Sequence, residues 1–364
     1  MPIDILLISG MKEATREALP RGVDYITLPA LQKNEQGQYG ARSLGLSLTS
    51  IIQLRSQIIR AAIIEYQPDL LIVDNVPRGA VRELDATLDY VKTQTHIRCV
   101  LGLRDILDTP DVVQRDWQRA ENEAAIRRYY DAIWIYGDPK VYDLTQQYHF
   151  AVDTRAKMKS LGYLDQRQRL RHMGASQLKQ VQSLNLPDKD FVLGVVGGGQ
   201  DGADLAIAFA KASLPKGLSG VLITGPFMPL EVKKRVQAIA EKRPNFYLVD
   251  YLEEPTYLMK RASRVVAMGG YNTTCEILSF QKKALIVPRV TPRQEQWIRA
   301  EQLQKLGLLD TLHPSKISPK KLSSWLKQPM KGVKSRQVIQ MNAAQNIVNE
   351  VQRLLCDVSL PKAC

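Results

Sequence analysis

GGYNTTCE, from Gly269 to Glu276, is the stretch that decides the fold, together with an earlier glycine-rich stretch, VVGGGQDGAD, from Val195 to Asp204. Each follows a β-branched run and leads into a helical pattern, so both are predicted to be turns from a strand into a helix. Glycines let the backbone approach a ligand closely, and the free N–H groups of a helix N-terminus attract anions, phosphates above all. Two such turns in one half of the chain predict a binding site for a diphosphate.

Strand-like apolar runs alternate with helical patterns throughout the 364 residues. This pattern is typical of an α/β protein whose parallel sheets are covered on both faces. The chain is too long for one ordinary core, so we expect two Rossmann-like domains that face each other across a cleft. The expected divisions are an N-terminal domain at 1–164, a linker at 165–189, a C-terminal domain at 190–330 that carries both glycine stretches, and a helix with a tail at 331–364.

The formal net charge of +13 favours anionic partners, such as nucleic acid, acidic lipid surfaces or nucleotide phosphates. Nucleic acid is the weakest of these, because the basic residues lack interleaved aromatic residues and match no reading motif. One basic interval, between Asp310 and Glu350, contains no acidic residue and surrounds Trp325, which we expect to be exposed. It predicts either a solvated surface or peripheral contact with an anionic membrane. Its basic residues are Lys316, Lys320, Lys321, Lys327, Lys331, Lys334 and Arg336.

The cysteines and the start of the chain bear on localisation. Four cysteines without metal-like spacing indicate a reducing compartment and no metal site. No apolar run reaches the length of a membrane span, and Met1 is followed directly by a strand-like run rather than by a signal sequence. We therefore expect a cytoplasmic protein, with the inner face of the membrane as its one possible peripheral site.

The second half of the chain resembles the donor-binding domain of the GT-B glycosyltransferases of family 28. The resemblance runs from Phe191 to Leu309 through three ordered motifs: the two glycine stretches and PRVTPRQEQWIRA, residues 288–300. More loosely, the whole chain is similar to a bacterial family of predicted glycosyltransferases, with VDYITLPAL, GLRDILD and LGY in its first half. The resemblance implies a GT-B fold and a transferase that uses a nucleotide-sugar donor.

The resemblance also implies which residues contact the donor. The diphosphate would lie on the first glycine loop and on the start of the helix after the second one. The residues at these two places are Gly198, Gly199, Gln200 and Gly202 in the loop, and Gly270, Asn272 and Thr273 at the helix. The nucleobase would lie against Tyr251 and Leu252, and Glu276 would accept hydrogen bonds from the ribose hydroxyls. Gln296 would contact hydroxyls of the sugar, with Ala300 packed below it.

Simpler roles for two of these residues stay open. Glu276 would also suit a carboxylate that complements a helix dipole, and Thr273 would also suit a helix cap. Two departures from the family pattern concern the donor. Asp201 is an insertion in the first loop, and Glu295 stands where the peptidoglycan enzyme of the family has a second glutamine, so the transferred sugar is open.

The third departure concerns catalysis. Family members begin with a strand and a loop that contains glycine and histidine, whereas Met1 here opens on the second strand and no G-H-x-x-R pattern occurs. We expect the first domain to lack its first βα unit, with a reading frame that starts upstream. The base is then expected among the remaining strand ends: Asp105 as the base and Arg104 as an acceptor or phosphate contact, with Asp74 ranked below Asp105. A helix cap is the alternative role of Asp105.

The predicted function is inverting, metal-independent transfer of a hexosyl group from a UDP-sugar to an unknown acceptor, without a cofactor. A lipid-linked or envelope-glycan acceptor is one class to consider. Two alternatives stay open, a GT-B-like UDP-sugar epimerase and a non-catalytic nucleotide-sugar-binding protein.

Overall fold

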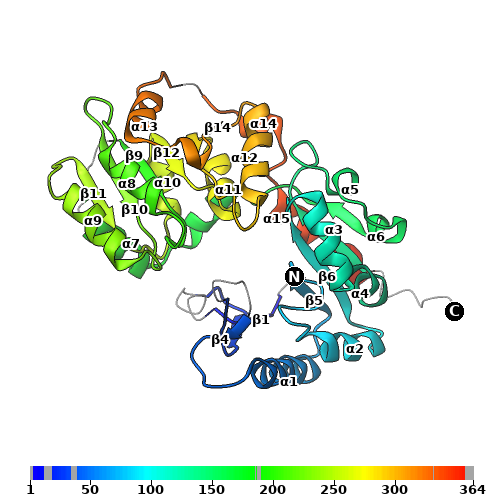
Figure 1. Ribbon diagram of the computed structural model, residues 1–364. Coiled ribbons are helices and arrows are strands. Elements are labelled where there is room, and N and C mark those ends of the chain that lie inside the picture. The colour runs from blue at the N-terminus through cyan, green and yellow to red at the C-terminus, as the bar shows by residue number, and fades with distance from the viewer. Residues whose placement is uncertain are drawn as a thin grey trace.

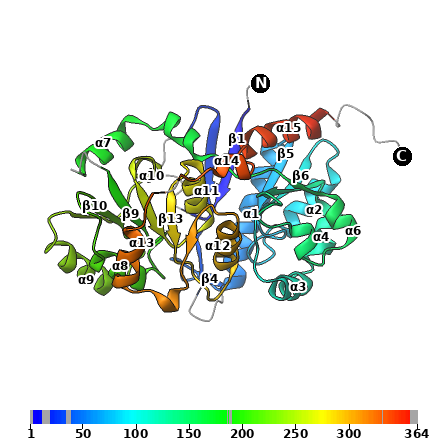
Figure 2. The same ribbon diagram turned by 90° about the horizontal axis from the view of Figure 1, so that it is seen from above.

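The computed structural model describes residues 3–11, 19–33, 39–184, 186, 190–330 and 332–356. Two α/β domains stand side by side, with the C-terminal helix of the chain lying on the N-terminal domain (Figure 1). Seen from above, the green and yellow C-terminal domain lies to the left and the cyan part of the N-terminal domain lies to the right (Figure 2).

The C-terminal domain is built on a parallel sheet of six strands in the order β11-β10-β9-β12-β13-β14. The strands are β9 (Phe191–Val195), β10 (Ser219–Ile223), β11 (Phe246–Val249), β12 (Arg264–Ala267), β13 (Lys283–Ile286) and β14 (Asp310–Thr311). The chain runs outward from β9 to β11 and then returns to place β12 on the other side of β9. The order of strands therefore reverses between β9 and β12, which is where open α/β sheets bind ligands.

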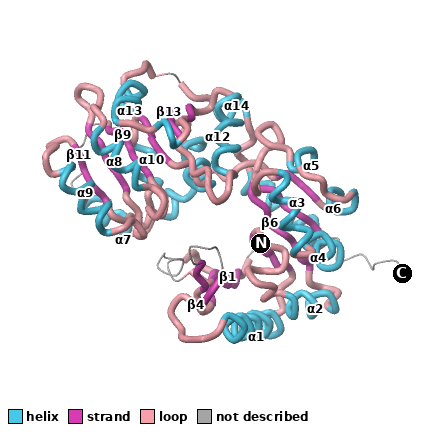
Figure 3. The backbone as a smooth tube through the Cα atoms, in the orientation of Figure 1, coloured by secondary structure: helices cyan, strands magenta, loops and turns pink. Residues whose placement is uncertain are grey.

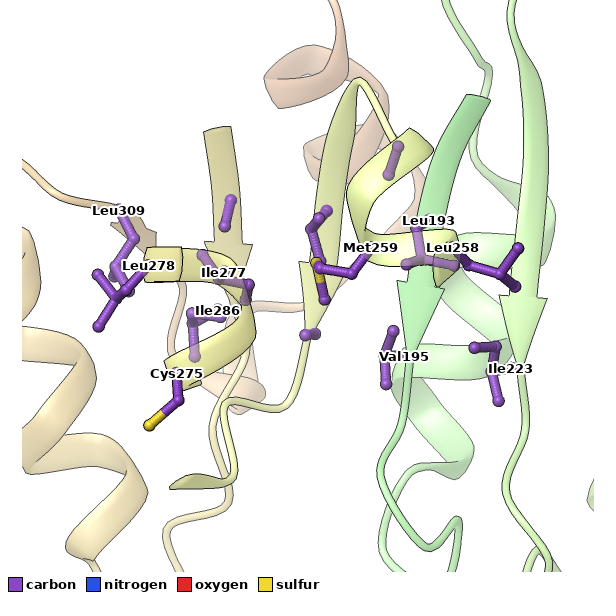
Figure 4. Packing of buried hydrophobic residues seen from close by; sticks show 14 of the residues in the cluster. Leu193, Val195, Ile223, Leu258, Met259, Cys275, Ile277, Leu278, Ile286 and Leu309 are labelled. Atoms are coloured by element: carbon purple, nitrogen blue, oxygen red, sulfur yellow. The ribbon is translucent and has the colours of Figure 1, made fainter. Parts of the chain in front are cut away.

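Helices cover both faces of this sheet. They are α8 (Ala203–Lys211), α9 (Leu230–Ala240), α10 (Thr256–Arg261), α11 (Tyr271–Ser279), α12 (Glu295–Lys305), the short 3-10 helix η3 (Pro314–Lys316) and α13 (Pro319–Leu326). All five residues of β9 are buried, and alternate side chains face opposite sides: Leu193 packs with α10 and α11, whereas Val192 packs with α8. Figure 4 shows Leu193 lying beside Leu258, where strand and helix meet.

The N-terminal domain has a parallel sheet of four strands in the order β5-β6-β7-β8. Its strands are β5 (Leu70–Asp74), β6 (Arg98–Arg104), β7 (Ala132–Tyr136) and β8 (Met158–Ser160). Its helices are α1 (Leu48–Tyr66), α2 (Asp85–Thr93), α3 (Pro110–Arg119), α4 (Asn122–Tyr129), α5 (Leu144–Gln147) and α6 (Val152–Ala156). The helices α3 and α4 are separate because Glu121 adopts a left-handed conformation between them (φ +54°).

The first four strands do not join this sheet. β1 (Ile5–Ser9) pairs in parallel with β2 (Val23–Thr27), and β3 (Leu31–Lys33) pairs antiparallel with β4 (Tyr39–Ala41), each as a separate sheet (Figure 3). The parallel sheet expected for this domain is therefore formed by β5 to β8, and the antiparallel pair β3–β4 was not expected. In the described ranges neither β1 nor β5 has a second partner strand, and Ile5 and Ile72 stay 50% and 44% exposed. A missing first βα unit stays a prediction.

The linker and the C-terminal segment tie the two domains together. The linker forms the 3-10 helix η2 (Gln166–His172) and α7 (Ala175–Ser183), and η2 packs on α10 and α11 of the C-terminal domain. After α14 (Ser335–Val338), the last helix, α15 (Ala343–Cys356), returns to the N-terminal domain. There it packs on the face of the four-stranded sheet that carries Trp134, and Lys159 forms an ion pair with its Glu350.

Trp325 is buried, contrary to the expectation of an exposed ring. It is 6% exposed, packs beside α8, and donates a hydrogen bond from Nε1 to Asp310 Oδ2 at 2.7 Å. The amphipathic period of α13 turns Leu322 and Trp325 inward and leaves the lysines in solvent. Those described as exposed are Lys316, Lys320, Lys321, Lys327 and Lys334, and Lys331 lies outside the described residues. No helix in the described ranges is long and apolar enough to span a membrane.

Candidate donor site and interdomain contact

The first glycine loop joins β9 to α8 and is held by backbone packing. At Gly199, φ is +91°, and a Cβ atom there would lie 2.2 Å from the carbonyl oxygen of Thr224. Gly202 is the residue before α8, and a Cβ atom there would lie 2.5 Å from Val196 Cβ. Gly198 and Gln200 are exposed. The loop therefore has its tightly packed glycines on the protein side and its open positions toward solvent.

We expect Gly199→Ala to destabilise the protein more than Gly217→Ala does. Gly217 also has a positive φ, +81°, but a Cβ atom there would meet nothing within 4 Å. The control therefore carries only the backbone cost, about 1 kcal/mol, whereas Gly199→Ala adds steric overlap of about 1–3 kcal/mol. Thermal unfolding of both variants measures the difference, and equal midpoints would show that the loop relaxes freely.

The second glycine turn joins β12 to α11. Gly270 directly precedes the helix, has an ordinary φ of −56°, and a Cβ atom there would meet nothing within 4 Å. Neither backbone conformation nor packing within the protein therefore requires glycine at this position, whereas close passage of a ligand would. No side chain in the described ranges caps α11, so its first N–H groups face outward beside exposed Asn272 and half-buried Thr273.

Glu276 lies on the second turn of α11. A carboxylate stabilises the helix dipole only from the first turn, so this alternative role does not apply to Glu276. It is 5% exposed and accepts a hydrogen bond from Thr256 Oγ1 at 3.3 Å. Burial raises its pKa to about 7, with the Glu254 carboxylate adding to the rise and Arg169 opposing it. Thr256 begins α10 directly after the loop that carries Tyr251 and Leu252, of which Tyr251 is exposed and Leu252 is buried. The structure thus places Glu276 next to the loop expected to hold the nucleobase.

The third loop follows β13. Gln296 Oε1 accepts a hydrogen bond from the backbone N–H of Arg289 at 3.1 Å, which orders the loop, and Ala300 is buried below. The Arg289 side chain forms ion pairs with Asp201 at 3.2 Å and with Glu295 at 3.0 Å. Because β9, β12 and β13 are neighbours, all three loops meet at one edge of the sheet. The predicted donor residues are therefore gathered in one place.

Comparison with known protein families finds a match in the second half of the chain. A family model described as the glycosyltransferase family 28 C-terminal domain matches residues 192–355. Those residues are similar to the C-terminal domain of family 28. No protein of curated function matches the sequence.

Solved structures match nearly the whole chain at low identity. MurG of Acinetobacter baumannii shares 14% identity at a TM-score of 0.54, over 92% of this chain and 86% of that one. UGT73P12 of Glycyrrhiza uralensis, complexed with glycyrrhetinic acid 3-O-monoglucuronide, shares 11% identity at a TM-score of 0.62. The match covers 99% of this chain and 91% of that one. The UDP-GlcNAc 2-epimerase of Neisseria meningitidis, bound to UDP-GlcNAc, shares 13% identity at a TM-score of 0.60. The match covers 97% of this chain and 100% of that one. The fold is GT-B, and with its family 28 domain the chain is a glycosyltransferase.

Asp105, expected as the base, lies instead in the contact between the N-terminal domain and the family 28 domain. It is 1% exposed, and its carboxylate accepts hydrogen bonds from Arg299 Nη2 at 2.7 Å and Nε at 2.8 Å, and from the Tyr163 hydroxyl at 2.8 Å. An enclosed, fully paired carboxylate leaves no room for an acceptor hydroxyl, so this geometry favours an interdomain ion pair. Asp105 does not cap α3 either, because that helix begins after Thr109.

The neighbouring Asp108 also joins the domains. It is 1% exposed, forms an ion pair with Arg293 at 3.2 Å, and accepts the backbone N–H of Gln294 at 3.0 Å. GLRDILD therefore docks on the start of α12. The sequence reasoning missed Arg293 and Arg299 as its partners. The only sequence signal for this pairing was that two motifs of opposite charge, GLRDILD and PRVTPRQEQWIRA, were each expected at the end of a strand.

Arg104 and Asp74 are the last residues of the neighbouring strands β6 and β5. Arg104 is exposed, with its guanidinium carbon 5.9 Å from the ring centre of Tyr271, the first residue of α11. The Tyr271 hydroxyl donates to the carbonyl oxygen of Tyr136 at 2.7 Å, which brings the second glycine turn against the end of β7. Asp74 is an exposed carboxylate at the end of β5. The described residues contain no cluster of His, Cys, Asp or Glu that would hold a metal ion.

Proposed function

We propose that the chain transfers a hexosyl group from a UDP-sugar to an acceptor held by the N-terminal domain. The observation that carries this proposal is the position of Glu276 in the family 28 domain. Through its hydrogen bond with Thr256, Glu276 lies beside the loop that would hold the nucleobase. The two glycine turns and the loop with Gln296 meet at the same sheet edge. A nucleoside, a diphosphate and a sugar would lie in that order across the edge.

The proposed transfer inverts the anomeric centre and uses neither metal nor cofactor. Charge on the leaving diphosphate would be stabilised by the N–H groups that begin α8 and α11, together with Arg104, which lies beside Tyr271. The acceptor hydroxyl needs a base. We assign that role to Asp74 in place of Asp105, because Asp74 is exposed at the end of β5 whereas Asp105 is enclosed by Arg299 and Tyr163.

A lipid-linked or envelope-glycan acceptor, met at an anionic membrane surface, is part of the proposal. The exposed lysines around α13 support it through charge alone, because buried Trp325 is not available to enter a membrane. The proposed location is the cytoplasmic face.

A UDP-sugar epimerase is the second candidate, favoured by the similarity of the Neisseria meningitidis epimerase over nearly the full length of both chains. An epimerase would change a UDP-sugar without any acceptor. A transferase would leave the UDP-sugar intact until an acceptor is added.

Calorimetric titration of the purified chain with UDP, GDP and dTDP tests the proposal, followed by incubation with UDP-sugars alone. We expect selective binding of UDP and no conversion of UDP-sugars without an acceptor. Epimer formation would assign the second function, and failure to bind any of the three nucleotides would contradict both. Binding of UDP without turnover across an acceptor panel would support a non-catalytic binding protein.

A further inference from the structure

We infer that Arg289 binds the diphosphate of the donor and that Asp201 occupies this arginine until the donor arrives. The inference rests on the proposed donor site and adds a residue to it. Arg289, Asp201 and Glu295 form one charged cluster at the mouth of the site.

The position of the cluster is the first step. Asp201 belongs to the loop after β9, and Arg289 belongs to the loop after β13. The strand between them is β12, whose end carries the second glycine turn. The ion pair between Asp201 Oδ2 and Arg289 Nη1, 3.2 Å long, therefore bridges the two loops that flank this turn. A diphosphate that contacts both glycine turns would lie next to this ion pair.

The second step is the way the arginine is held. Its backbone N–H donates to Gln296 at 3.1 Å, and Nη2 donates to Glu295 Oε1 at 3.0 Å. Glu295 is a positioning residue, because its side chain is only 19% exposed and holds the guanidinium through Nη2, whereas Asp201 contacts Nη1. Arg289 Nε and Glu295 Oε2 are buried without hydrogen-bond partners in the described residues. The cluster thus retains hydrogen-bonding capacity that the donor-free protein does not use.

The third step compares the two anions. The Asp201 side chain is 50% exposed and that of Arg289 30% exposed, and ion pairs this open to solvent contribute little stability. A diphosphate carries more negative charge than a carboxylate and offers several oxygens to the planar guanidinium. The donor would therefore displace Asp201, which stands in for a phosphate in the donor-free protein. The two departures from the family pattern, Asp201 and Glu295, meet on this one arginine.

The experiment compares UDP with uridine, which lacks phosphate, in calorimetric titrations of Asp201→Asn and Arg289→Gln. We expect Arg289→Gln to weaken UDP binding at least about tenfold and Asp201→Asn to strengthen it about threefold or more, with uridine affinity unchanged in both. In the double variant the gain from Asp201→Asn should vanish, because the two residues act through one contact. Glu241→Gln is the charge-matched control, since Glu241 is exposed after the last turn of α9, at the end of the helix away from the glycine loops, and should leave UDP affinity within about twofold.

Unchanged UDP affinity in Arg289→Gln would overturn the inference while leaving the donor site in place. An equal loss of uridine and UDP affinity in that variant would also overturn it, because it would indicate a distorted site. Absence of UDP and uridine binding by the unmodified chain would instead contradict the proposed function, and the inference would fall with it.

Discussion

Glu276→Ala is expected to abolish detectable UDP binding, a loss of at least about 100-fold, without unfolding the protein. The carboxylate would accept hydrogen bonds from two ribose hydroxyls in a nearly dry site, where charge-assisted hydrogen bonds are strong. Calorimetry measures the affinity, and circular dichroism checks the fold. Glu241→Ala is the control, because that exposed side chain follows the last turn of α9, at the end of the helix away from the sheet edge that carries the three loops. Normal UDP affinity in Glu276→Ala would remove the donor-site assignment.

The same carboxylate makes UDP binding depend on pH. Burial raises the pKa of Glu276 from 4.5 to about 7, and only the ionised form accepts both ribose hydroxyls. UDP affinity should therefore fall about tenfold per pH unit below 7 and stay level above it. Stability changes in the opposite direction. Because the pKa of Glu276 in the folded protein lies above 4.5, the free energy of unfolding falls as the pH rises from 4.5 to 7. The thermal midpoint of Glu276→Gln should therefore exceed that of the unmodified chain, with the largest difference at pH 8.

Arg299→Met is expected to destabilise the protein by about 3–5 kcal/mol, the cost of leaving a buried charge unpaired. Arg299 and Asp105 are each 1% exposed, and desolvation opposes their charges while the pairing between them stabilises both. The thermal midpoint should fall by roughly 10 °C. Arg128→Met is the control, because its ion pair with Asp89 joins two exposed side chains, 66% and 54% exposed, and its loss should cost about 1 kcal/mol or less.

The double variant Asp105→Leu/Arg299→Met separates the two roles of Asp105. If the pair is structural, removing both charges should restore much of the stability lost in Arg299→Met, since no unpaired charge remains. Turnover should then recover with stability. A stable double variant without any turnover would instead return Asp105 to the role of base.

The local features of the chain could be read from the sequence because they depend on neighbouring residues. Both glycine turns follow strands and begin helices as predicted, since Gly199 adopts a conformation that other residues rarely take and α11 begins directly after Gly270. The alternation of strands and helices was also predicted, because burial on both faces requires apolar strands such as Phe191–Val195. The gathering of the three donor loops at one sheet edge follows from the α/β order itself.

Partners distant in the sequence were decided only by the tertiary structure. Asp105 looked equally suited to be a base or a cap, and its partner Arg299 lies 194 residues away in the other domain. Trp325 looked exposed among lysines until α13 turned it against α8. The separation of β1 and β2 from β5 was likewise not encoded in their own patterns, because the apolar period of a strand does not specify its neighbour. Charge and hydropathy show what a side chain needs, whereas the packing of the whole chain determines which group meets that need.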